Sequence, residues 1–281
     1  MLIMQRLTFL LLIMSVASAT WAQPDSCARP DPNFHLYLLM GQSNMAGRGV
    51  ITDSLKALNH NRVYMLNARG EWVPARHPVH FDKPTVIGVG PGLSFGVQMA
   101  LANPNVRIGL VPCAVGGTGI DRWQPGAYDE ATKTHPYDDA VQRIENARQC
   151  GVVKGMLWHQ GESDSNPDGA VAYLPKLAQL IERVRGLTGQ SALPVVVGEL
   201  GQYKEIYRLI NVKLPKLPAL VPHTAVATSE GLTHKGDQTH FDGASAHEYG
   251  HRYAKRMLAL QAVQTVAPGK QPRKPSAKNR R

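Results

Sequence analysis

The sequence predicts an α/β fold in which a parallel β-sheet is covered by helices on both faces. Two observations predict it. Apolar runs of strand length alternate with longer amphipathic stretches through most of the chain, and polar, glycine-containing turns follow several of the runs. The length of 281 residues suits one large domain, and 43% hydrophobic and 19% charged residues are typical of a globular protein.

The expected strands are short, apolar and rich in branched residues, and they fall at 35–40, 63–66, 106–112, 152–158, 194–200 and 224–228. The expected helices have helical spacing of apolar residues or a capping residue, and they fall at 94–102, 138–150, 170–186 and 242–260. Prolines and glycines between these elements predict irregular segments at 24–33, 74–92 and 202–222.

The two ends of the chain differ from the domain between them. Residues 1–23 combine Arg6, an apolar core at 7–16 and small residues, which is the pattern of a secretion signal. Residues 266–281 form a Pro-, Lys- and Arg-rich tail that we expect to be disordered, and they supply six of the charges behind the net charge of +10. We therefore expect a globular domain at 24–265 in a secreted or periplasmic protein.

Two classes of partner are not indicated. No aromatic residues interleave with the basic tail, so the charge does not predict a nucleic-acid-binding protein. The apolar core of the signal is shorter than the roughly 20 residues of a membrane span, and no later segment is long enough. The oligomeric state is left open.

The chain has three cysteines, Cys27, Cys113 and Cys150. Cys27 precedes the first expected strand and Cys150 precedes the strand at 152–158, so both fall at the N-terminal edge of a parallel sheet. We hypothesise that these two form a disulfide. Cys113 ends a strand at the opposite edge, where we expect a small buried residue.

Ser43 follows the first expected strand in a turn that contains Gly41, Gln42 and Asn44. A strand that ends in a sharp turn carrying one serine is how α/β enzymes expose a nucleophile at the C-terminal edge of the sheet. The alternative is a loop serine that only caps the next helix.

Residues for a base and its partner occur near the end of the chain, just before the last helix. Asp237 and His240 are three positions apart, so one short loop could bring an imidazole to Ser43 and a carboxylate behind it. Asp-x-x-His by itself is a weak motif, and it gains meaning from the strand–serine turn.

Hydrogen-bond donors for a developing oxyanion are the third requirement. Gly116 and Gly117 follow the strand at 106–112 and can present bare backbone N–H groups, and Gln160 after the strand at 152–158 can add an amide. The alternatives are a plain tight turn and a surface glutamine.

Four blocks occur in order: Gly41-Gln42-Ser43-Asn44-Met45, Gly116-Gly117-Thr118, His159-Gln160-Gly161-Glu162 and Asp237-x-x-His240. Together they resemble the SGNH (GDSL-like) hydrolases and, within them, the sialate O-acetylesterase and acetylxylan esterase branch of carbohydrate esterases. The resemblance implies a three-layer α/β/α, flavodoxin-like fold with a parallel five-stranded sheet. It also implies hydrolysis of acyl, typically acetyl, esters on sugars without metal or cofactor.

The resemblance implies Ser43 as nucleophile, His240 as base and Asp237 as its partner. It implies an oxyanion hole made by the Ser43 N–H, Gly117 and Gln160, with Gly116 as an alternative glycine.

Further residues are weaker candidates. Glu162 could orient His240 alone or with Asp237. We further consider Gln42, Asn44 and Trp123 as substrate contacts.

Two alternatives remain. His247-Glu248-x-x-His251 fits the zinc-protease motif on an expected helix, although no clear third ligand follows it. A non-catalytic carbohydrate-binding protein on the same fold would bind sugar without turnover.

Overall fold

The computed structural model describes residue 27 and residues 29–266. The expected signal peptide at 1–23 lies outside the described residues, as does the basic tail beyond 266. In the described part of the chain, no helix has the length and apolar character needed to cross a membrane.

The centre of the protein is a seven-stranded sheet in the order β3-β2-β4-β1-β5-β6-β7. The strands are β1 (Asp31–Gly41), β2 (Val63–Leu66), β3 (Trp72–Pro74), β4 (Arg107–Pro112), β5 (Gly151–His159), β6 (Val195–Gly198) and β7 (Thr224–Ala227). All neighbouring pairs are parallel except β2 with β3.

The predicted α/β fold with a parallel sheet is confirmed. The sheet has one strand more than the six expected from the sequence and two more than the five that the resemblance implies. The antiparallel edge strand β3 has only three residues, too few for a recognisable strand pattern. The segment expected to be a linker at 24–33 also ends early, because β1 begins at Asp31.

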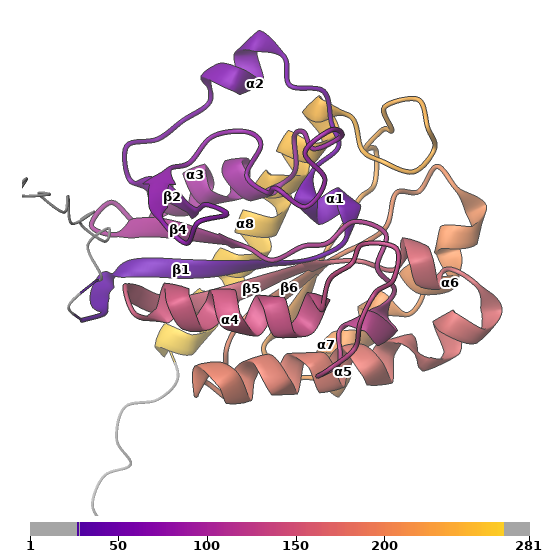
Figure 1. The fold of residues 1–281 in the computed structure, drawn as a ribbon. Coiled ribbons are helices and arrows are strands. Elements are labelled where there is room, and N and C mark those ends of the chain that lie inside the picture. Colours follow the sequence, from indigo (N-terminus) through magenta and orange to yellow (C-terminus); the bar gives the residue numbers. More distant parts are fainter. Residues whose placement is uncertain (1–26, 28, 267–281) are drawn as a thin grey trace, which may run out of the picture.

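Helices cover both faces of the sheet (Figure 1). The helices are α1 (Ser43–Ala46), α2 (Asp53–Ala57), α3 (Gly92–Ala102), α4 (Pro136–Arg148), α5 (Pro167–Thr188), α6 (Arg208–Asn211), α7 (Leu217–Leu220) and α8 (Gly243–Val266). Figure 1 shows α3 and α8 on one face and α4, α5 and α7 on the other.

The central strand β1 separates two hydrophobic cores. Leu36, Leu38 and Met40 pack on the side of α4 and α5, whereas Tyr37 and Leu39 pack on the side of α3 and α8. This alternation follows from the two-residue period of a strand, and burial on both faces explains the uninterrupted apolar run.

The two edges of the sheet carry different chemistry. At the N-terminal edge Cys27 and Cys150 form a disulfide with Cα atoms 5.0 Å apart, which confirms the hypothesised pairing. Cys113 is free and buried, as expected. At the opposite edge, the turns after β1, β4 and β5 and the loop after β7 meet.

Candidate active site

Ser43 stands at the end of the buried central strand, as the first residue of α1. Gly41 has φ +128°, and a Cβ at this position would collide with the backbone of His159. The next N–H, that of Gln42, donates to the His159 carbonyl over 2.9 Å, so the turn is tied to β5. Ser43 lines a cavity of about 490 Å³, here called the Ser43 pocket, together with Gln42, Gly117, Asp237 and His240.

A hydrogen-bonded line of three side chains runs into this pocket. Nε2 of His240 lies 3.0 Å from the Ser43 hydroxyl, and Nδ1 lies 2.7 Å from Oδ2 of Asp237. Burial raises the pKa of Asp237, but hydrogen bonds from the N–H and imidazole of His240 and from the Thr239 N–H outweigh burial and lower it. The Asp237 side chain is therefore a carboxylate that accepts from the imidazole at neutral pH.

The loop that carries His240 is held by Asn44, the residue after the serine. The Asn44 amide donates to the Thr239 carbonyl (3.0 Å), and its oxygen accepts the Phe241 N–H (3.1 Å). Asn44 is 4% exposed and is bonded on both sides of His240. Its expected role as a substrate contact is wrong, because donor and acceptor already have protein partners.

Glu162 reaches Asn44 rather than His240. Its carboxylate accepts from the Asn44 amide over 2.6 Å and lies 3.5 Å from Nε2 of His159. Burial raises the pKa of Glu162, but His159 and Asn44 more than compensate and lower it. The expectation that Glu162 orients the His240 imidazole directly is thus not met, since Asp237 occupies that position.

Ser43 and Gly117 both line the pocket, and the backbone N–H of neither has a hydrogen-bond acceptor among the described residues. Gly117 has φ +90°, a conformation that favours glycine. The N–H of Gly116 donates instead to Asp82 over 2.8 Å, so Gly116 is not available as an alternative donor. Asp82 is also paired with buried Arg48 at 2.7 Å, which anchors the glycine turn.

Contrary to the expectation from the sequence, Gln160 does not line the Ser43 pocket. It is 1% exposed, and its Nε2 donates to Gln42, to the Thr118 carbonyl and to Asp164. The amide hydrogens of Gln160 are therefore committed to protein acceptors.

Gln42, rather than Gln160, lies at the wall of the Ser43 pocket. Its Oε1 accepts from Gln160 over 3.1 Å, which turns the Gln42 amide nitrogen away from Gln160. Nε2 of Gln42 has no acceptor in the part of the chain that the structure describes, and Gln42 lines the pocket.

Trp123 lies in the core. It is fully buried, its indole N–H donates to Thr118 over 3.2 Å, and its ring packs edge-on against Trp158 with centroids 5.1 Å apart. Trp123 is therefore not placed as the substrate contact that was expected, because it has no exposed surface and does not line the Ser43 pocket.

The zinc motif is not arranged as a metal centre. The rings of His247 and His251 pack against each other with centroids 4.7 Å apart, and Glu248 pairs with Arg252 at 3.0 Å. Among residues 27 and 29–266, no three His, Cys, Asp or Glu side chains form a group that could hold a metal ion.

Several residues that hold the site in place were not identified from the sequence. Asp82, Arg48 and Asp164 hold the glycine turn and Gln160, and the Tyr203 hydroxyl donates to the Thr239 carbonyl over 3.0 Å. Asp164 stands next to the His159 block and could have been suspected, whereas Asp82 lies in an irregular segment with no motif.

Comparisons with known proteins show the family to which the chain is related. A family model described as carbohydrate esterase, sialic acid-specific acetylesterase matches residues 33–259. A protein of Arabidopsis thaliana named probable carbohydrate esterase At4g34215 is 31% identical over 255 residues, 82% of this chain and 92% of the relative.

Solved structures extend the comparison. The crystal structure of that Arabidopsis protein superposes with a TM-score of 0.73 over 82% of this chain and 99% of the relative. NanS (TM-score 0.67, 19% identity, 84% of this chain and 99% of that one) shares the fold. So does XAC1771, a carbohydrate acetylesterase from Xanthomonas citri (TM-score 0.64, 22% identity, 82% and 57%).

Proposed function

Because the chain belongs to the carbohydrate esterase family of sialic acid-specific acetylesterases, we propose that it is a serine esterase that removes acetyl groups from carbohydrates. The observation that carries the proposal is the line from Asp237 through His240 to Ser43, with contacts of 2.7 and 3.0 Å at the wall of a cavity. This is the arrangement in which an imidazole can take the proton of a serine hydroxyl.

In the proposed reaction, the Ser43 oxygen attacks the ester carbonyl while its proton passes to Nε2 of His240. The tetrahedral intermediate expels the sugar hydroxyl, which receives that proton, and leaves an acetyl-serine. A water molecule then attacks the acetyl group, again with His240 taking the proton, and acetate leaves as Ser43 regains its hydrogen. Asp237 stabilises the imidazolium at each stage.

The oxyanion is stabilised by the N–H groups of Ser43 and Gly117 and by the side-chain amide of Gln42. Gln42 supplies the donor that we first expected from Gln160, and Gln160 acts from behind by holding Gln42. Preorganised donors of this kind are worth about 10²- to 10³-fold in rate each.

Lysines surround the pocket. Lys83, Lys204 and Lys235 line it. Its two acidic residues are paired within the protein, Glu162 beside His159 and Asp237 with His240 and, at 3.7 Å, with Lys235, so Lys83 and Lys204 are the lysines without an ion pair among the described residues. This supports, as a finer proposal, an acylated sugar that carries a carboxylate, whose binding would weaken with salt.

Export is proposed on two observations. Residues 1–23 have the pattern of a secretion signal, and a disulfide between Cys27 and Cys150 suits an oxidising compartment. Expression in a bacterial host with analysis of the periplasm tests it, since a shortened mature chain is expected there.

The central test is Ser43→Ala with an aryl acetate and with acetylated xylan, O-acetylated sialic acids and simple acetyl sugars as substrates. The variant should remain folded and lose at least about 10⁴-fold in turnover. Near-normal turnover in Ser43→Ala would overturn the mechanism. A wild-type protein that binds sugar without releasing acetate would instead favour the non-catalytic alternative.

A further inference from the structure

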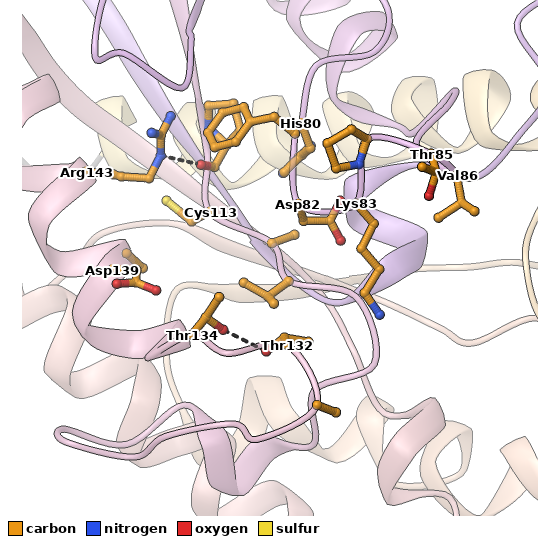
Figure 2. Close-up of a pocket in the computed structure, with 17 residues that line it drawn as sticks. His80, Asp82, Lys83, Thr85, Val86, Cys113, Thr132, Thr134, Asp139 and Arg143 are labelled. Carbon is orange, nitrogen blue, oxygen red and sulfur yellow. Dashed lines mark hydrogen bonds between the residues drawn. The ribbon is translucent and has the colours of Figure 1, made fainter.

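A second cavity, here called the side pocket, lies beside the Ser43 pocket and has a volume of about 680 Å³. Its walls come from residues 80–86, 112–115 and 131–134 and from one side of α4 (Figure 2). A cavity of this size is within the range of about 300–1,000 Å³ that is usual for ligand pockets. The proposed mechanism does not use it.

The two cavities adjoin. Lys83 and Val86 line both, and Val115 of the side pocket is followed directly by the two glycines of the Ser43 pocket. Asp82 lies in the wall of the side pocket, and its carboxylate accepts the Gly116 N–H over 2.8 Å. A molecule whose ester reaches Ser43 could therefore extend into the side pocket.

One wall of the side pocket offers apolar surface to solvent. Phe81 is 36% and Val86 50% exposed, so both offer apolar surface to a molecule in the cavity. The Arg143 guanidinium lies 4.6 Å from the Phe81 ring centre, and it is itself fixed by the carbonyls of Pro112 (2.6 Å) and Leu66 (2.8 Å). The Phe81 ring is thus a supported platform.

The opposite wall is polar. Figure 2 shows Thr132, Thr134 and Asp139 across the cavity from residues 80–86. One oxygen of Asp139 accepts the His135 N–H over 3.1 Å, and the other has no partner among the described residues. Thr132 donates to Asp129 and bonds with Thr134, both over 2.8 Å, so the exposed Asp139 carboxylate is the acceptor on this wall that suits a ligand rich in hydroxyl donors.

A sugar ring has this combination of surfaces, an apolar C–H face and a rim of hydroxyl groups. A long acyl chain would fit the first wall but would remove the Asp139 carboxylate from water without replacing its hydrogen bonds, which is costly. We propose that the side pocket is a second carbohydrate subsite, which binds the sugar next to the one that carries the ester. The proposal rests on the proposed function and makes the substrate an acylated disaccharide or longer glycan.

The test compares acetylated xylobiose with acetylated methyl xyloside, and O-acetylated sialyl-lactose with O-acetylated sialic acid. Methyl acetate, too small to reach the side pocket, reports on Ser43 alone. Ala131→Trp fills the side pocket from an exposed position, and Asp139→Asn removes the free carboxylate. Ala102→Trp, exposed at the end of α3 on the other face, is the matched control.

We expect the wild type to prefer the disaccharide of at least one pair. Ala131→Trp should raise KM for that disaccharide about tenfold or more, with methyl acetate and the monosaccharide unchanged. Asp139→Asn should act in the same direction, and Ala102→Trp should not.

Three outcomes overturn the proposal. If the wild type hydrolyses the mono- and disaccharide esters with equal kcat/KM, the second subsite is ruled out but the proposed esterase function is not. Loss of methyl hexanoate rather than disaccharide hydrolysis in Ala131→Trp assigns the cavity to the acyl chain. Hydrolysis of methyl acetate with no carbohydrate ester accepted overturns the proposed function as well.

Discussion

The side-chain amide of Asn44 donates to the Glu162 carboxylate over 2.6 Å and to the Thr239 carbonyl over 3.0 Å. Through these bonds the residue after the proposed nucleophile holds the loop that carries the proposed base. Glu162 also lies 3.5 Å from Nε2 of His159, at the end of the neighbouring strand β5. The loop that carries His240 is therefore held by Asn44 in addition to the contacts of the imidazole with Asp237 and Ser43.

Asn44→Ala should lower kcat about 10²-fold with little change in KM, because a small displacement of His240 from Ser43 spoils proton transfer. Aryl acetate kinetics and circular dichroism measure activity and folding. Asn59→Ala, which removes an exposed local hydrogen bond, is the control. Unchanged kcat in Asn44→Ala would show that the loop is held without Asn44.

Asp237→Asn should lower kcat about 10³- to 10⁴-fold, since the amide cannot stabilise the imidazolium as the carboxylate does. Glu162→Gln should cost less, about tenfold, because Glu162 acts through Asn44 rather than on the imidazole. Steady-state kinetics of both variants show which of the two substitutions lowers kcat more. A Glu162→Gln defect as large as that of Asp237→Asn would contradict the assignment of the two carboxylates.

Gln42→Ala should lower kcat about 10²-fold with an unchanged KM, because an oxyanion donor acts mainly in the transition state. Gln160→Ala should have a smaller effect, and the double variant should resemble Gln42→Ala, since Gln160 acts through Gln42. If the losses in kcat are additive in the double variant, or if Gln160→Ala loses more than Gln42→Ala, the oxyanion donor is Gln160 rather than Gln42.

Stability should fall in weak acid because of His77. Burial, aided by the nearby His247, lowers the pKa of His77 from 6.5 to about 4. As the pH falls through 6.5, the unfolded chain binds a proton that the folded protein does not bind until the pH nears 4. The free energy of unfolding therefore decreases with falling pH across this window.

His77→Phe should reduce the slope of this pH dependence because the group no longer titrates. The buried His80, whose pKa burial also lowers from 6.5 to about 4, accounts for a part that remains. Urea unfolding midpoints between pH 7 and 4.5 measure it, with His135→Phe, at an exposed position, as the control. If His77→Phe keeps the slope of the parent protein, His77 is not the group responsible.

Cys27→Ser together with Cys150→Ser should lower the free energy of unfolding by about 2–5 kcal/mol, since the disulfide closes a long loop with a sequence separation of 123. Activity of the folded variant should be unchanged, because the disulfide lies at the opposite edge of the sheet from Ser43. Urea unfolding and aryl acetate kinetics are the two measurements. Loss of activity in a folded variant would contradict this prediction, because it would show that the disulfide at the N-terminal edge of the sheet affects the site at the opposite edge.

Much of the site follows from residue types near the ends of expected strands. Ser43, Gly117 and the Asp237–His240 pair stand where the order of strands and turns places them, because parallel strands end at one edge. The roles of Asn44 and Trp123 could not be predicted from the sequence. An asparagine beside a serine and a tryptophan after a glycine turn look the same in sequence whether they face a substrate or the core.

The sequence by itself determined the alternation of strands and helices, the edge at which the polar turns meet, and the residue types available there, because periodicity and turn chemistry are local. Only the tertiary structure decided which of two glutamines faces the pocket and which of two carboxylates meets the imidazole. The first choice depends on the hydrogen bond between Gln42 and Gln160, and the second on the bond that holds Glu162 at Asn44 rather than at His240, and each joins segments more than a hundred residues apart. Distances of that kind are set by strand register and loop geometry, which no local pattern contains.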